Sequence, residues 1–128
     1  MDDTPILVVD DDPNSLDIVR TFLEAKGYTV ATASDGKAAL AQLEVVRPRL
    51  VLLDVMMPGI DGWEVARIIK NHPDFGGVRI VMLTARSDFT DKQEGLRAGA
   101  DDYIVKPVRL DDLGKRVEAN LQALRRSA

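Results

Sequence analysis

Five polar residues in four separate parts of the 128-residue sequence each follow a short apolar segment: Asp10, Asp11, Asp54, Thr84 and Lys106. Carboxylates about 4 Å apart repel by roughly 4 kcal/mol per pair at an effective dielectric of ~20, so folding alone gives no reason to gather three of them. A cation with oxygen ligands relieves that repulsion, and Mg²⁺ is commonly bound by one or two carboxylates and phosphate oxygens. A hydroxyl and an ammonium beside it would bind phosphoryl oxygens. The residue types therefore predict phosphoryl chemistry, in which Asp54 can attack phosphorus and form an acyl phosphate.

These residues can lie close together only if the fold brings the ends of the apolar segments to one edge of a sheet. Five β-branched apolar segments alternate with amphipathic stretches along the chain. The predicted strands are 6–9, 28–33, 50–53, 78–83 and 103–105, and the predicted helices are 14–26, 36–46, 63–70, 88–98 and 110–124. Such an α/β alternation predicts a doubly wound five-stranded parallel sheet with helices on both faces, in the flavodoxin-like order 2-1-3-4-5. Ligands bind such sheets outside the carboxyl ends of strands 1 and 3, where the chain reverses direction.

Composition excludes several other classes of protein. The chain has 17 Lys and Arg against 21 Asp and Glu, a net charge of −4, no Cys and one His, so any metal must be a hard cation such as Mg²⁺, Mn²⁺ or Ca²⁺. No apolar run approaches the ~18 residues of a membrane span, and the acidic start does not resemble a signal peptide. The longest basic run, Arg125-Arg126, argues against nucleic-acid binding by this domain itself. We therefore expect one domain, residues 1–128, in the cytoplasm.

Four motifs at these positions resemble the receiver domain of the two-component response regulators. They are Val8-Val9-Asp10-Asp11, the segment LDVMMPGIDG at 53–62, Leu83-Thr84-Ala85 and Tyr103-Ile104-Val105-Lys106-Pro107. They stand in the family's order and spacing, and the resemblance runs from about Thr4 to Leu124. The glycines at 59 and 62 would allow close backbone approach beside Asp54.

The resemblance implies a role for each matching residue. Asp54 would be the phosphoacceptor, and it would hold Mg²⁺, or Mn²⁺ in its place, together with Asp10, Asp11 and the main-chain carbonyl of Met56. Thr84 and Lys106 would bind the phosphoryl oxygens. Tyr103 would be an aromatic switch residue that turns inward when Thr84 moves, and the Lys106–Pro107 peptide bond would be cis.

The resemblance also implies partners. A sensor histidine kinase or a histidine phosphotransfer protein would present phosphohistidine, and the domain would assist its own phosphorylation and dephosphorylation without being an enzyme in the usual sense. Phosphorylation would change the surface formed by 88–98, 103–105 and 110–124, which would signal to an effector protein or domain. The resemblance leaves room for a phosphorylation-dependent dimer.

Other residues have simpler interpretations. Asp12 before Pro13 is typical of a helix N-cap rather than a third metal ligand. Asp101-Asp102 is expected to be a solvated turn, and His72 before Pro73 a solvated loop residue. Trp63 and Phe89 are expected to be partly buried.

Three other functions are compatible with parts of the pattern. A magnesium-dependent phosphohydrolase with an aspartyl-phosphate intermediate, like the haloacid dehalogenases, would use Asp10 as its nucleophile, but this length leaves no room for a substrate-binding insertion. A flavodoxin would need a phosphate loop after the first strand, where three aspartates would repel a phosphate. A degenerate receiver would lack some of the acidic, hydroxyl or lysine residues that are all present here.

Overall fold

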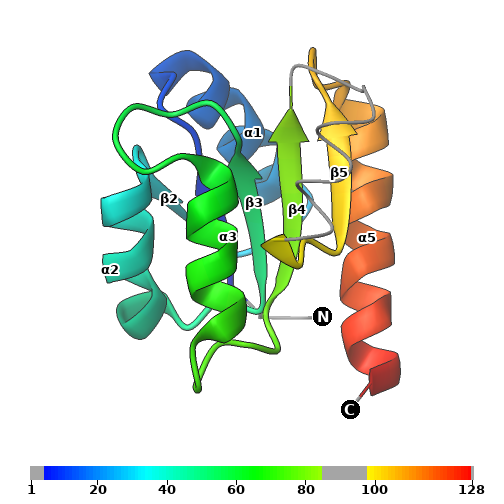
Figure 1. Ribbon diagram of the computed structural model, residues 1–128. Helices are drawn as coiled ribbons and strands as arrows, with labels where there is room; N and C mark the ends of the chain where they lie inside the picture. Colours follow the sequence, from blue (N-terminus) through cyan, green and yellow to red (C-terminus); the bar gives the residue numbers. More distant parts are fainter. Residues whose placement is uncertain (1–4, 85–97, 128) are drawn as a thin grey trace.

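The computed structural model describes residues 5–84 and 98–127. The strands are β1 (Ile6–Val9), β2 (Val30–Ala33), β3 (Leu50–Asp54), β4 (Arg79–Thr84) and β5 (Asp102–Val105). The helices are α1 (Pro13–Ala25), α2 (Gly36–Val46), α3 (Gly62–Asn71) and α5 (Leu110–Ser127). All strands are parallel in the order β2-β1-β3-β4-β5, which confirms the predicted topology (Figure 1). The predicted helix 88–98 lies, apart from its last residue, outside the described residues.

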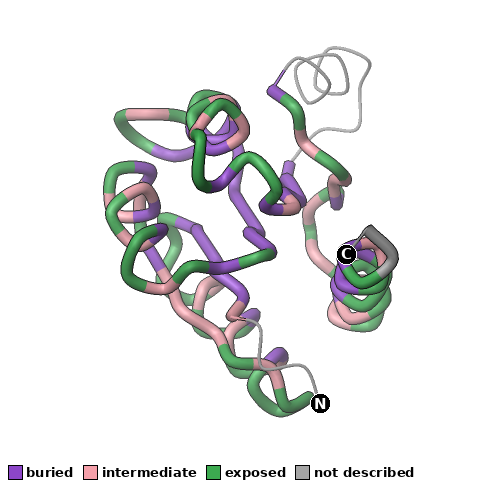
Figure 2. The backbone as a smooth tube through the Cα atoms, turned by 90° about the horizontal axis from the view of Figure 1, so that it is seen from below, coloured by how far each residue is buried: buried purple, intermediate pink, exposed green. Residues whose placement is uncertain are grey.

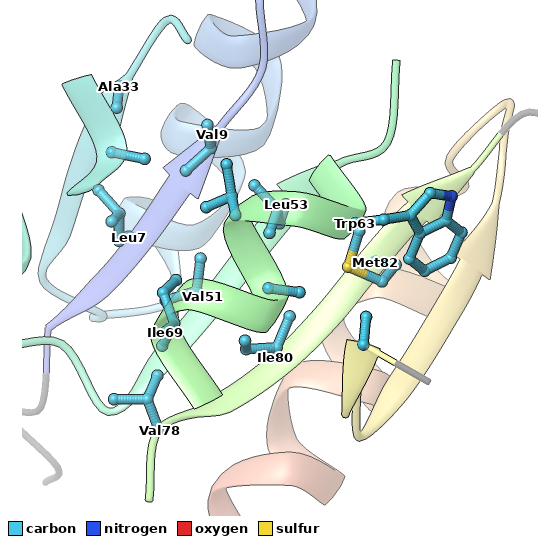
Figure 3. Close-up of a cluster of buried hydrophobic side chains, with 14 of the residues drawn as sticks. Leu7, Val9, Ala33, Val51, Leu53, Trp63, Ile69, Val78, Ile80 and Met82 are labelled. Carbon is cyan, nitrogen blue, oxygen red and sulfur yellow. The ribbon is translucent and has the colours of Figure 1, made fainter. Parts of the chain in front are cut away.

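The sheet is the centre of the molecule because both of its faces are covered. Every residue of β1 and β3 is buried, as expected for a parallel sheet between two helix layers (Figure 2). Leu7, Val51 and Ile80 pack toward α2 and α3, in the cluster drawn in Figure 3. Their neighbours along the strands, such as Ile6 and Leu50, pack on the other face against α1 and α5. The polar residues that follow these buried strands are therefore held on a rigid support.

Aspartate caps begin the first three helices. Asp12 accepts a hydrogen bond from the Asn14 amide with Pro13 in the first turn, which confirms its interpretation as a cap. Asp35 and Asp61 cap α2 and α3 in the same way. Part of the acid excess of the sequence is thus explained by helix starts.

Two local features differ from or extend the sequence prediction. The second strand begins at Val30 rather than Tyr28, because the Tyr28 amide donates to the Leu23 carbonyl and belongs to the end of α1. Gly114 lies inside α5 facing the Phe22 ring of α1, where a Cβ would make an ordinary contact at 3.4 Å. Among the described residues no helix combines the length and apolarity that crossing a membrane requires.

Candidate functional site

The register of the strands brings the predicted site residues to one edge of the sheet. Val9 pairs with Leu53 in the neighbouring strand, so Asp10 and Asp54 leave the sheet side by side. On the other side of Asp54, Thr84 ends β4 and pairs with Val105, the residue before Lys106. This is the carboxyl edge of the sheet, to which the strand arrows point in Figure 1.

Three carboxylates and one ammonium form the centre of the site. Oxygen atoms of Asp10, Asp11 and Asp54 all lie within 4.8 Å of one another. Lys106 Nζ lies 3.1 Å from Asp54 Oδ2 and 3.7 Å from Asp10 Oδ2. Asp10 and Asp54 are only 2% and 3% exposed, whereas Asp11 faces solvent. We name these four residues the acid cluster.

Backbone groups hold the two buried carboxylates in place. Asp10 Oδ1 accepts from the Asp12 amide at 2.9 Å, and Asp54 Oδ1 accepts from the Met56 amide at 3.3 Å. The loop after Asp54 folds back so that the Gly62 amide donates to the Val55 carbonyl at 2.9 Å. A Cβ on Gly62 would lie 2.2 Å from the Asp54 carbonyl oxygen, so only glycine fits there. The predicted close approach is confirmed for Gly62.

The acid cluster carries excess negative charge. Burial raises the pKa of Asp54, the nearby Lys106 opposes this through its hydrogen bond and charge, and the charge of Asp10 raises the pKa further. One lysine cannot balance three carboxylates, and ionised groups in a buried position are costly unless they are paired. Three oxygen donors with surplus negative charge are the ligand set that a hard divalent cation prefers, so the residues fit Mg²⁺ or Mn²⁺.

The remaining predicted residues lie around the acid cluster. Thr84 is buried, and its carbonyl accepts from the Lys106 amide at 2.6 Å. The Lys106–Pro107 bond is cis, as the resemblance implied. The Met56 residue is 71% exposed. Tyr103 is half-buried in β5 and packs on the cluster under α2 and α3, and its switching role stays a prediction.

The prediction of a solvated turn at Asp101-Asp102 is confirmed only in part, because Asp101 is an exposed residue just before β5, but Asp102 begins that strand and both side chains are bound by other parts of the chain. Asp101 Oδ2 accepts from Lys70 Nζ and from the Ile80 amide, each at 2.8 Å. Asp102 Oδ1 accepts from Arg116 Nη1 at 2.8 Å. These contacts tie α3, β4, β5 and α5 together at the amino edge of the sheet, opposite the acid cluster. The partners are far away in the sequence, so no local pattern could have found them.

Two ring side chains are also more buried than predicted. His72, expected to be solvated, is half-buried and its ring lies 4.7 Å from that of Phe75. Its Nδ1 accepts from the Asp74 amide at 3.0 Å. Trp63 is only 8% exposed, and it belongs to the core cluster under α3 (Figure 3). Phe89 lies outside the described residues.

Comparisons with known proteins agree with this geometry. The sequence matches the response regulator receiver domain family over residues 6–118. The chain belongs to this family. Its fold is that of solved receiver domains. One of these is the response regulator receiver domain protein (CheY-like) of Methanospirillum hungatei, which is 32% identical and superposes with a TM-score of 0.90. This superposition covers 99% of this chain and 100% of the other. The chemotaxis response regulator CheY4 of Vibrio cholerae gives 0.88 at 32% identity, over 93% and 99% of the two chains.

A curated relative extends the comparison beyond the receiver domain. The DNA-binding response regulator MtrA of Mycolicibacterium smegmatis is 44% identical over 117 residues, which cover 91% of this chain and 50% of that protein. The chain thus spans about half the length of such relatives. This chain is a receiver domain of two-component systems, and the comparisons do not favour the alternative phosphohydrolase with Asp10 as nucleophile.

Proposed function

We propose that this receiver domain accepts a phosphoryl group on Asp54 in a magnesium-dependent reaction. The observation that carries the proposal is the acid cluster, in which a buried aspartate lies 3.1 Å from a lysine ammonium and beside two further carboxylates. A structural ion pair would not need the surplus acids. The donor would be phosphohistidine on a sensor histidine kinase or a histidine phosphotransfer protein, because response regulators work with such proteins.

The chemistry assigns a separate task to each side chain. A carboxylate oxygen of Asp54 attacks phosphorus in line, the P–O bond forms as the P–N bond of phosphohistidine breaks, and the imidazole leaves with a proton. Lys106 and the Thr84 hydroxyl bind the transferred oxygens. Asp10, Asp11, Asp54 and the Met56 carbonyl would hold Mg²⁺, which when bound neutralises negative charge on the phosphoryl oxygens. The domain would catalyse its own phosphorylation and dephosphorylation through these groups.

The output would follow from changes next to the acid cluster. Thr84 would shift toward the phosphoryl group, Tyr103 would turn inward, and the surface of 88–98, β5 and α5 would change its affinity for an effector protein or domain. A dimer formed through phosphorylation belongs to the same proposal. MtrA is named a DNA-binding response regulator, but in this chain we assign no nucleic-acid or membrane contact to the receiver domain, and we place it in the cytoplasm.

The central experiment is phosphorylation by acetyl phosphate with Mg²⁺, followed by intact mass. We expect an adduct of about 80 Da on the wild-type chain, a parallel change in Trp63 fluorescence, and no adduct on Asp54→Asn. The control Asp12→Asn alters a helix cap next to the acid cluster and should still be phosphorylated. An adduct that survives Asp54→Asn and disappears in Asp10→Asn would overturn the proposal in favour of Asp10 as the nucleophile.

A second experiment tests the metal site by thermal unfolding. At ten times its dissociation constant, Mg²⁺ should stabilise the domain by about 1.4 kcal/mol, which raises the Tm by roughly 5 °C. Asp11→Asn should lose most of this rise, because it removes an exposed ligand without disturbing the core, and Asp12→Asn should keep it. An equal rise in both variants would show that Mg²⁺ does not bind through Asp11.

A further inference from the structure

A cavity at the amino edge of the sheet has no part in the proposed phosphoryl chemistry. It has a volume of about 300 Å³ and lies between the connection from α2 to β3 and the connection from α3 to β4. Its polar lining consists of Arg47, Arg49 and Asp74, and its apolar lining includes Phe75. A cavity of this volume is at the lower end of the range for small-molecule sites.

The two arginines of this cavity differ from the others that the structure describes. Each of the other described arginine side chains lies next to a carboxylate: Arg20, Arg67, Arg79, Arg109, Arg116 and Arg125. Within the described part of the chain, neither Arg47 nor Arg49 has a carboxylate partner. Such a pair is unexpected in a domain with 21 acidic residues and a net charge of −4. The cavity is therefore a local positive site on an acidic protein.

The backbone around the two arginines is fixed. Arg47 ends α2 in a left-handed conformation, with φ of 51°, and its amide donates to the Leu43 carbonyl at 2.9 Å. Its guanidinium lies over the Phe75 ring, 5.6 Å from the centroid. Arg49 is held on both sides, because its carbonyl accepts from the Arg79 amide and its own amide donates to the Pro5 carbonyl. The backbone is therefore already in place for binding, and only the two exposed arginine side chains would need to be ordered.

The charges of the lining define the ligand. Two guanidiniums present planar sets of donors that match the oxygens of a phosphate or carboxylate group. Asp74, the single acid of the lining, leaves one net positive charge and disfavours highly charged polyanions. We infer that this cavity binds a small oxyanion, namely the phosphate or carboxylate group of a small molecule, separately from the acid cluster. The inference does not depend on phosphorylation of Asp54.

The test is an NMR titration of the whole chain with inorganic phosphate, and in parallel with succinate, in the absence of Mg²⁺. We expect saturable shifts at the Gly77 amide and at the Arg47 and Arg49 side-chain Nε resonances, with millimolar affinity. Arg47→Gln and Arg49→Gln should each weaken binding about tenfold, the usual effect of losing one charged hydrogen-bond donor. Asp74→Asn should strengthen it, and the control Arg20→Gln, a paired arginine on α1, should leave it unchanged. Tighter binding of phosphate than of succinate identifies a phosphate ester as the ligand, and the reverse order identifies a carboxylate.

Three outcomes would overturn the inference. The first is the absence of saturable shifts at these residues, and the second is their reproduction by sodium chloride at equal ionic strength. The third is shifts that persist when both arginines are replaced. Phosphate could also bind near Lys106. Such binding differs from binding in the cavity because its shifts are centred on the acid cluster, and it persists when both arginines are replaced. If the arginine variants fold poorly, Asp74→Asn alone decides, since unchanged or weaker binding contradicts the inference.

Discussion

Among the described residues, acidic side chains gather at both edges of the sheet, and basic side chains match them in number only at the amino edge. There Asp101 accepts from Lys70 Nζ and from the Ile80 amide, and Asp102 pairs with an arginine of α5. At the carboxyl edge the described residues include three clustered carboxylates and one lysine, Lys106, which contacts Asp10 and Asp54. The amino-edge acids stand at the start of β5, whereas the carboxyl-edge acids follow β1 or end β3 of the same sheet.

This difference indicates that the amino edge serves the stability of the fold and the carboxyl edge serves its function. The paired edge satisfies its charges and a buried amide within the chain, so it stabilises the fold. At the carboxyl edge the described residues carry more negative than positive charge, which costs stability and favours binding of a cation and a phosphoryl group. Substitutions at the amino edge should therefore lower the free energy of unfolding without affecting phosphorylation, whereas substitutions at the carboxyl edge should affect phosphorylation.

Gly62→Ala should give the largest effect, at the carboxyl edge. The added Cβ would lie 2.2 Å from the Asp54 carbonyl oxygen and 2.8 Å from Val55 Cα, so the backbone that carries Asp54 must move. We expect the free energy of unfolding to fall by about 3 kcal/mol and phosphorylation by acetyl phosphate to slow by a factor of roughly 100. Urea unfolding and intact mass measure the two effects.

Gly77→Ala is the matched control, because no atom lies within 4 Å of a Cβ at that position. It should change stability by less than about 1 kcal/mol and leave phosphorylation intact. A Gly62→Ala chain that is phosphorylated at the normal rate would show that the backbone at Asp54 is not held by this contact.

Asp101→Ala should give the next largest effect, at the amino edge. It removes the partner of Lys70 and leaves the Ile80 amide without its acceptor, and the Asp101 side chain is only 22% exposed. We expect a loss of about 2 kcal/mol, with about half of that loss in Asp101→Asn, whose amide oxygen can still accept from Ile80. Phosphorylation and the response to Mg²⁺ should not change in either variant.

Glu44→Ala, an exposed acid on α2, controls for the loss of one negative charge and should change stability by less than about 0.5 kcal/mol. Equal losses in Asp101→Ala and Glu44→Ala would mean that the paired edge does not stabilise the fold. Loss of phosphorylation in a folded Asp101→Ala chain would mean that the two edges are coupled.

The carboxyl edge could be predicted from the sequence because each part of it is local. Buried strands end at the polar residues Asp10, Asp54 and Thr84, and the parallel topology with short connections brings those ends together. The cap at Asp12 was equally local, because it depends on the neighbouring Pro13 and the amide two residues later.

The amino edge could not be predicted, since its contacts join distant residues. Asp101 lies 31 residues from Lys70 and 21 from Ile80, and the sequence around it looks like a polar turn. The start of β2 was predicted at Tyr28 instead of Val30 for a related reason. The Tyr28 amide donates to the Leu23 carbonyl at the end of α1, a contact that the strand pattern of the sequence does not indicate. Arg47 and Arg49 likewise stand out only in the structure, where each of the other described arginine side chains lies next to a carboxylate.

The smallest expected effect concerns the pH dependence of stability at the carboxyl edge. Burial raises the pKa of Asp54 in the folded chain despite the opposing effect of Lys106. A raised pKa means that folding favours the protonated form. The contribution of Asp54 to stability is therefore complete below its ordinary pKa of 3.8 and is lost as pH rises through the folded-state value. At neutral pH the ionised Asp54 costs stability.

Asp54→Asn, which cannot ionise, should consequently be more stable than the wild type near pH 7.5 without Mg²⁺, and its advantage should vanish at about pH 3.5. Urea unfolding followed through Trp63 fluorescence measures both values, with Glu44→Gln as the control for removing one exposed charge. Saturating Mg²⁺ should reduce the advantage at neutral pH, because the cation stabilises the ionised wild-type cluster and binds the variant less tightly. A variant that is less stable than the wild type at neutral pH would mean that attraction by Lys106 outweighs burial. In that case the carboxyl edge would be a paired, stabilising edge like the one around Asp101, and its surplus acids would need another explanation.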